Sequence, residues 1–161
     1  MKPSPIEQYV ERMGGAMTDA GLPRLPSRVF AALTADDDGR MTSAELSDAL
    51  GISPAAVSGA IKFLTQVGFV HRERERGTRR DVYVVDDDAW HGAMVQKDTA
   101  YAPMLKALDD GLAGLPADSP ARPRLVLMRE FLAFVSAEMD GIAERWETRR
   151  RELEADLRAH P

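Results

Sequence analysis

Five arginines lie between positions 72 and 80, and their spacing suits contact with a polyanion: Arg72, Arg74, Arg76, Arg79 and Arg80. The first three alternate with His71, Glu73 and Glu75, which is the two-residue period of a β-strand. Such a strand carries three guanidinium groups on one face, where they could bind phosphates or enter the minor groove of DNA. Alternatively, Glu73 and Glu75 pair with these arginines, and the segment is an edge hairpin kept soluble by alternating charge.

This positive charge is local. The whole chain has a net charge of −5, which argues against a protein coated uniformly in lysine. Residues 53–81, by contrast, hold six basic and three acidic side chains. Because phosphate contact depends on local rather than net charge, the acidic balance of the chain does not exclude nucleic-acid binding.

A short helix that could enter a DNA groove precedes the arginines. Ser53 and Pro54 are typical of an N-cap and a first helical residue, and Gly68 is placed to end the helix. An apolar stripe, which should face the core, consists of Val57, Ile61, Leu64 and Val67. The positions off this stripe are small or able to form hydrogen bonds: Ala55, Ala56, Ser58, Gly59, Lys62 and Gln66.

These residue types suit the major groove. Ser58 can bind a base edge or a phosphate, and Lys62 a phosphate or a guanine edge. Ala55 and Ala56 could contact a thymine methyl group, and Gly59 would allow the helix to approach the groove floor closely. The competing interpretation is a solvated face on a purely structural helix.

The elements on either side predict a winged helix-turn-helix. A capping box, Thr42-Ser43-Ala44-Glu45, opens a first short helix that ends at Gly51. Two short helices joined by a tight, glycine-containing turn form a helix-turn-helix. After Gly68, residues 69–76 and the β-branched return strand 82–85 predict a hairpin with Gly77 at its tip. Thr42 and Ser53, which cap the two helices, complete the predicted set of DNA-binding residues.

Long helices are predicted at both ends of the chain. Ser4 and Pro5 begin the first, which ends at Gly21; a short helix should follow Pro26. Residues 86–88 cap a further helix that Pro103 should kink or break, and a helix over about 119–158 would be roughly 60 Å long. Because that exceeds the core of so small a protein, we expect dimerisation through apolar positions of the terminal helices: Ile6, Val10, Met13, Leu132, Val135, Met139, Ile142 and Trp146.

The helix-turn-helix segment resembles the MarR superfamily, particularly its GbsR-like branch. The resemblance covers about residues 26–85 and rests on Met41-Thr42-Ser43-Ala44-Glu45-Leu46, Leu50-Gly51-Ile52-Ser53, Val57-Ser58, Leu64, Gly68-Phe69-Val70 and Arg72. The resemblance implies a ligand-responsive repressor that binds a palindromic operator as a homodimer in the cytoplasm. One departure is Gly59, where many relatives carry a large polar residue, so DNA shape should contribute more to specificity here.

We therefore expect a mainly α fold with a small β-wing in three regions. Residues 1–24 form an N-terminal helix that contributes to dimerisation, residues 25–86 the winged helix-turn-helix, and residues 87–161 a C-terminal dimerisation region. The expected partners are double-stranded DNA, a second copy and a small-molecule effector. Trp90 and Tyr101 are candidate effector-binding residues, with a cation–π cage as one option against plain core packing. A winged-helix module that binds proteins instead of DNA is the alternative.

Other functions find little support in the sequence. The chain has no cysteine, which excludes disulfides and thiolate metal sites. It begins with no secretory signal, and no apolar run is long enough to span a bilayer. Residues 34–45 resemble a calcium-binding loop, but Thr34 stands where its first aspartate is expected. The three histidines, His71, His91 and His160, lie far apart, and no catalytic or phosphate-binding motif is present. We expect no enzyme, metal or cofactor.

Overall fold

The computed structural model describes residues 3–75, 77, 80–95 and 97–160. The chain divides into two compact units, Met1–Ala93 and Met94–Pro161, which we describe separately. Among the described residues, no helix is long and apolar enough to cross a membrane.

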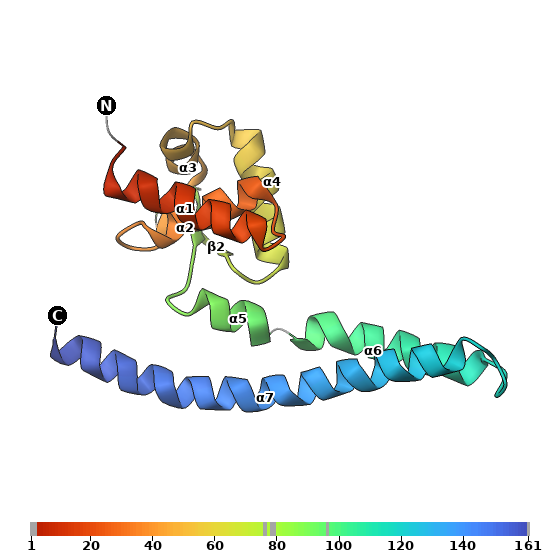
Figure 1. The fold of residues 1–161 in the computed structure, drawn as a ribbon. Coiled ribbons are helices and arrows are strands. Elements are labelled where there is room, and N and C mark those ends of the chain that lie inside the picture. Colours follow the sequence, from red (N-terminus) through yellow and green to blue (C-terminus); the bar gives the residue numbers. More distant parts are fainter. Residues whose placement is uncertain (1–2, 76, 78–79, 96, 161) are drawn as a thin grey trace. The chain divides into compact units, whose positions relative to one another are not determined.

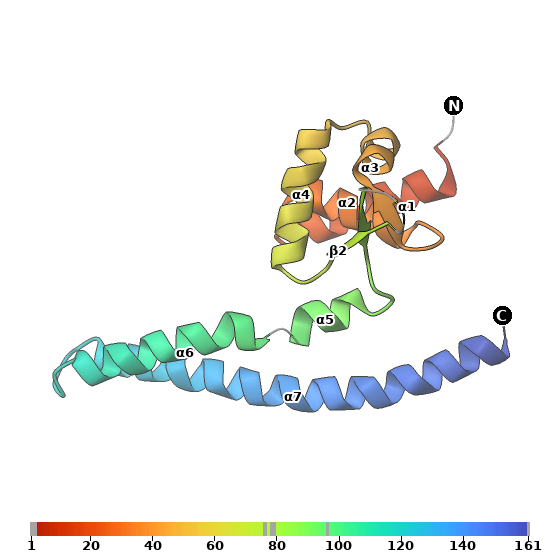
Figure 2. The ribbon, with the colours of Figure 1, turned by 180° about the vertical axis from the view of Figure 1, so that it is seen from behind.

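In the described part of the first unit, helices α1 to α4 surround a small sheet, as Figures 1 and 2 show. The helices are α1 (Pro5–Asp19), α2 (Arg24–Thr34), α3 (Ser43–Leu50) and α4 (Pro54–Gln66). The strands are β1 (Arg40–Thr42), β2 (His71–Arg74) and β3 (Asp81–Val84), in the antiparallel order β1-β3-β2. A short helix, α5 (Ala89–Val95), follows the sheet. The prediction of a mainly helical winged fold is confirmed.

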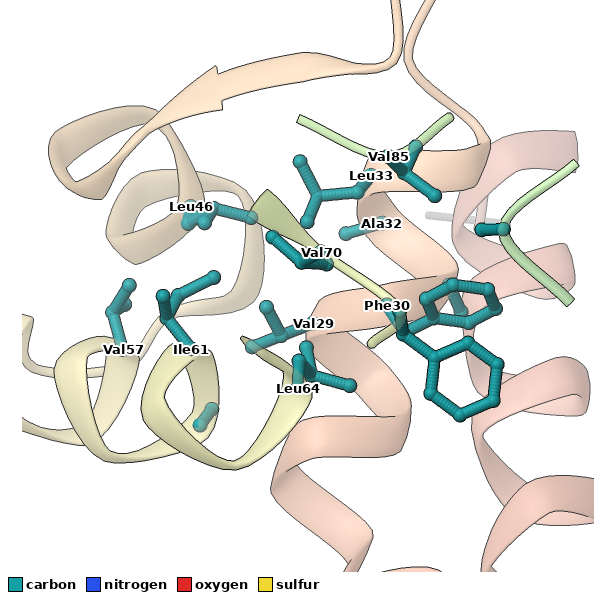
Figure 3. Close-up of a cluster of buried hydrophobic side chains, with 14 of the residues drawn as sticks. Val29, Phe30, Ala32, Leu33, Leu46, Val57, Ile61, Leu64, Val70 and Val85 are labelled. Carbon is teal, nitrogen blue, oxygen red and sulfur yellow. The ribbon is translucent and has the colours of Figure 1, made fainter. Parts of the chain in front are cut away.

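A single apolar core holds the first unit together, and α2 lies at its centre. Val29, Phe30 and Leu33 of α2 are buried together with Leu46 of α3 and Leu64 of α4 (Figure 3). The turns of α2 that carry these residues contact α1, α3 and α4. Burying each such side chain contributes about 1.5–3 kcal/mol, so α2 fixes the position of both helices of the helix-turn-helix.

Three aromatic rings extend this core toward α5. The centroids of Phe30 and Phe69 lie 4.8 Å apart, and Trp90 meets both rings edge-on at 5.7 and 4.9 Å. Edge-to-face pairs add about 0.5–1.5 kcal/mol beyond the area they bury. Trp90 is nevertheless 47% exposed, so this residue has both a packing role and an accessible surface.

The first unit differs from expectation in three respects. α1 packs on α2, and Val10 and Met17 of α1 belong to the core of this unit, so little of Val10 remains accessible to another subunit. α2 begins at Arg24, two residues before Pro26; proline fits there because the first turn of a helix lacks backbone acceptors for its N–H groups. β1 was not predicted, because its three residues gain a partner only through the distant β3.

The second unit is a helical hairpin of α6 (Lys97–Gly114) and α7 (Arg122–Ala159). The predicted long helix is confirmed with a start at Arg122, and Pro123 rather than Pro120 lies in its first turn. Pro103 lies inside α6, so of the predicted kink or break at this residue the break is wrong, and the kink stays a prediction. A proline removes one backbone hydrogen bond and strains the helix locally; packing along α7 offsets that cost.

The capping box at the start of α3 is formed as predicted. The backbone N–H of Glu45 donates to the Thr42 hydroxyl (3.3 Å), and the backbone N–H of Thr42 donates to the Glu45 carboxylate (2.7 Å). This backbone hydrogen bond is the main reason that the pKa of Glu45 lies below its ordinary value; the Thr42 hydroxyl and the charge of Arg80 lower it further. The ionised carboxylate therefore stabilises the first helix of the motif.

Replacing Thr42 by alanine should lower the free energy of unfolding by about 0.5–2 kcal/mol, because α3 loses its cap.

Replacing Glu45 by glutamine should destabilise the protein only at pH values where the wild-type carboxylate is ionised. The folded pKa is lowered, so this contribution is full above the ordinary value of 4.5 and is lost as the pH falls through the lower folded value. Denaturant unfolding across that range measures it; a Glu45→Gln penalty independent of pH would contradict the assignment.

Candidate nucleic-acid interface

The turn between α3 and α4 sets the angle of the second helix. Gly51 ends α3 in the left-handed conformation, with φ 62° and ψ 38°, which glycine adopts without steric cost. Ser53 then caps α4: its hydroxyl accepts the backbone N–H of Ala56 at 3.2 Å, and Pro54 is the first helical residue. Both helix boundaries agree with the sequence prediction.

α4 has one buried face and one bare face. Val57, Ala60, Ile61 and Leu64 are buried. The residues predicted to face DNA are exposed, except that Ala56 is half-buried: Ala55, Ser58, Gly59, Lys62 and Gln66. No bulky apolar side chain lies on the bare face, which is the surface that a helix needs in order to enter the major groove.

Gly59 leaves open space on this face. A Cβ atom built at Gly59 would meet no heavy atom within 4 Å, so packing does not require glycine here. A glycine in a helix interior costs roughly 0.5–1 kcal/mol relative to alanine. On the exposed face of α4 the missing side chain leaves room for another surface to approach the helix closely.

The hairpin behind α4 also has two distinct faces. Arg72 is directly opposite Tyr83, and Arg74 opposite Asp81, so these four side chains share the outer face of the sheet. His71 and Glu73 lie on the other face, opposite the buried Val84 and Val82. The predicted two-residue period is confirmed, and it directs Arg72 and Arg74 away from the core.

Ion pairs divide the arginines of the hairpin into two kinds. Arg72 pairs with Asp81 across the strands at 2.9 Å. Glu73 pairs with Arg40 of β1 at 2.7 Å and with His71 at 3.1 Å, and these hydrogen bonds, the one from Arg40 first, hold the pKa of Glu73 below its ordinary value. Arg74 is exposed and forms no ion pair within the described part of the chain. Glu73 therefore pairs with Arg40 and not with an arginine of the hairpin, so the alternative in which Glu73 and Glu75 neutralise these arginines fails for Glu73; its part that concerns Glu75 stays a prediction.

Thr42 and Arg80, two further residues predicted to contact DNA, lie close together. Thr42, Ser43 and Ala44, at the start of α3, line a shallow cavity of about 410 Å³ with Arg80 and Tyr83. The first helix of the motif and the base of the hairpin thus present one continuous surface. Arg76 and Arg79 lie outside the described residues.

The predicted effector residues belong to different units. Trp90 packs on Phe30 and Phe69 in the first unit, and Tyr101 is half-buried on α6 of the second. Neither placement tests the proposed role in binding an effector.

α7 carries an exposed apolar strip, of which sequence analysis predicted only Ile142 as an interface residue. Leu127, Phe131 and Phe134 are 71%, 64% and 63% exposed and follow one another at spacings of four and three residues. Met128 and Ile142, which flank this strip, are 50% and 45% exposed. The predicted dimerisation residues Leu132, Val135, Met139 and Trp146 are half-buried instead. We call Leu127, Met128, Phe131, Phe134 and Ile142 the α7 strip.

Comparison with known proteins gives a consistent result. Residues 20–81 match the model of the MarR family, and residues 88–150 match that of MmpR5-like MarR family transcriptional regulators. The chain is 31% identical to the HTH-type transcriptional regulator MmpR5 of Mycobacterium tuberculosis over 145 residues, covering 89% of this chain and 88% of that protein. It is 28% identical over 82 residues to the putative HTH-type transcriptional regulator YvaV of Bacillus subtilis, covering 51% of this chain and 46% of that protein. A crystal structure of a transcriptional regulator superimposes with a TM-score of 0.80 at 30% identity, covering 90% of this chain and 99% of the other.

Proposed function

Because this chain belongs to the MarR family of DNA-binding transcriptional regulators, we propose that it acts as a homodimer that reads duplex DNA through α4 and the hairpin. The observation that carries this proposal is the pairing of two surfaces in one unit. The outer face of α4 is free of bulky side chains, and Arg72 and Arg74 point outward from the adjoining sheet. Neither surface contributes to the core, so their residue types serve an external partner.

We expect two kinds of contact with DNA, namely charged contacts with phosphates and close contacts with base edges. Lys62 and Arg74 are exposed cations that form no ion pair within the described residues, so they can neutralise phosphates without breaking an internal contact. Arg72 would have to exchange Asp81 for a phosphate. Ser58 and the open space at Gly59 suit close contact with base edges. Specificity then depends on a few side chains and on the shape of the groove.

Dimerisation supplies the second DNA-binding surface. The α7 strip exposes five large apolar side chains on one helix, and exposed apolar patches that are rimmed by polar residues often mark sites of protein–protein contact. A second copy seated on this strip would bury it and hold two α4 helices at a fixed separation, about 34 Å for adjacent turns of DNA. Ile6, which is 58% exposed on α1, remains a candidate for the same interface.

Members of the MarR family also bind effector ligands. We propose that an effector releases this protein from DNA by favouring a different separation of the two DNA-binding units, which requires unequal affinity for the two states. Repression is the sign of regulation that we propose. The placement in the GbsR-like branch stays a prediction, as do the roles of Trp90 and Tyr101.

Replacing Arg74 by alanine should weaken binding to all duplex sequences and reduce the salt dependence of binding. Each lost phosphate contact lowers the slope of log K against log salt by about 0.9, so a dimer should lose about twice that. Arg24→Ala, an exposed arginine at the start of α2, is the matched control and should leave the slope unchanged. The slopes are measured by fluorescence anisotropy. Equal slopes for Arg74→Ala and the wild type would show that Arg74 does not contact DNA. If the wild-type protein bound no DNA at all, the alternative of a protein-binding module would be favoured.

Replacing Gly59 by alanine should separate stability from binding. The new methyl group meets no neighbour, so the free energy of unfolding should rise by about 0.5–1 kcal/mol. DNA affinity should fall at least severalfold, because the methyl group holds α4 away from the groove floor. Gly15→Ala is a close control, since a Cβ there also meets nothing within 4 Å; it should stabilise α1 and leave affinity unchanged. Unaltered DNA affinity in Gly59→Ala would refute the close approach.

Replacing Phe131 by glutamate should convert the dimer to a monomer, because a charge at the centre of the α7 strip would be buried without a partner. Sedimentation equilibrium measures the molar mass directly. Ala137→Glu, an exposed position of α7 outside the strip, should leave the mass of the dimer unchanged. A dimeric Phe131→Glu protein would show that the interface lies elsewhere.

A further inference from the structure

An open groove in the first unit belongs to neither the DNA-binding surface nor the α7 strip. It lies where α1, α2, α3 and β1 meet and has a volume of about 520 Å³, within the usual range for small-molecule sites. Its floor is mainly apolar and is formed by Ile6, Val10, Ala32, Ala35, Met41 and Leu50. Ile6 is 58% exposed, so an apolar occupant would remove a large side chain from water.

The charges around this groove are unbalanced. Its polar lining consists of three carboxylates, Glu7, Glu11 and Asp36, and one guanidinium, Arg28. Arg28 forms an ion pair with Glu11 at 2.7 Å, and the three carboxylates and one guanidinium together leave the lining with a net charge of −2. The groove therefore combines an apolar floor with a net negative rim, and this combination favours a ligand with an apolar body and a positive head group.

In Glu11 and Asp36, only one of the two carboxylate oxygens accepts hydrogen bonds from the described part of the chain. Arg28 donates from Nε and Nη2 to the same atom, Glu11 Oε1, at 3.0 and 2.7 Å. The backbone N–H groups of Asp38 and Arg40 both donate to Asp36 Oδ1 at 3.1 Å. Within the described residues, Glu11 Oε2 and Asp36 Oδ2 accept no hydrogen bond. Each can accept one from a ligand without releasing its structural partner.

We propose that this groove binds small amphipathic cations, with the apolar body on Ile6, Val10 and Met41 and the ammonium group at Glu11 or Asp36. The site goes beyond the proposed DNA-binding function, and its occupancy does not depend on that function. Its position does connect it to the motif: Ala49 and Leu50, the last residues of α3, line the groove next to the turn at Gly51. A bound cation contacts the helix that precedes α4.

The test is direct binding of three probes that share one alkyl chain and differ in head group. Octylammonium, 1-octanol and octanoate are titrated into the full-length wild-type protein by calorimetry near neutral pH. Octylammonium should bind with a dissociation constant on the order of 0.1–1 mM, the range expected for so few atoms, about fivefold more tightly than octanol. Octanoate should bind most weakly. Equal affinity for octylammonium and octanol, or no binding of either, would overturn the proposal.

Two variants separate the head group from the floor. In Glu11→Gln/Asp36→Asn the amide oxygens can still accept the internal hydrogen bonds, but the negative charges are gone; octylammonium should then bind about as weakly as octanol. Asp37→Asn, one residue away and not in the groove, is the matched control and should bind like the wild type. Ala49→Leu, at an exposed helical position, should fill the groove and weaken both probes.

A second copy or a basic peptide segment is the competing occupant. If dimerisation covered the groove, the dimer would bind none of the probes, whereas the monomeric Phe131→Glu protein would bind them; that result would overturn the proposal for small cations. Wild-type affinity for octylammonium in the Glu11→Gln/Asp36→Asn protein would do the same. Loss of DNA binding in any of these variants concerns the DNA-binding proposal alone, because the probes are measured without DNA.

Discussion

The packing of α4 against α2 is the constraint on which the rest of the structure depends. Ile61 and Leu64 of α4 belong to the same buried cluster as Val29 and Phe30 of α2 (Figure 3), and this fixes the rotation of α4 about its own axis. A rotation by one residue, about 100°, would turn a buried position toward water and carry an exposed position into the core. The apolar core therefore determines which side chains α4 presents, even though none of the presented residues is part of it.

The features that could be predicted from the sequence are those that depend on residues close together in the chain. Helix caps at Thr42 and Ser53 and the apolar stripe of α4 depend on residues a few positions apart, so local patterns predict them. The bare face of α4 follows from that stripe by elimination. The hairpin was predictable from its two-residue period, and its register then placed Arg72 and Arg74 on one face.

Features that depend on distant partners could not be predicted in this way. β1 has three residues, and its pairing with β3 joins positions 40 to 44 residues apart in the sequence. The partner of Glu73 is Arg40 of that strand, which no local pattern indicates. On α7, one regular series of apolar residues suggested the dimer interface, but apolar residues cover a wider part of the helix surface than that series. The neighbouring α6 determines which part of that surface is covered, and the exposed part is the strip at Leu127 and Phe131.

The short strand β1 has a mechanical consequence. It runs from Gly39 directly into the cap of α3 at Thr42, and it is hydrogen-bonded to β3, the inner strand of the hairpin. At its start the backbone N–H of Val85 donates to the Gly39 carbonyl at 2.9 Å, and Gly39 has φ 63° with space for no side chain: a Cβ would lie 3.1 Å from the Val85 carbonyl oxygen. The hairpin is thus joined to the first helix of the motif by the hydrogen bonds between β3 and β1 and then by the chain from β1 into α3, so a displacement of the wing is transmitted to the helix-turn-helix.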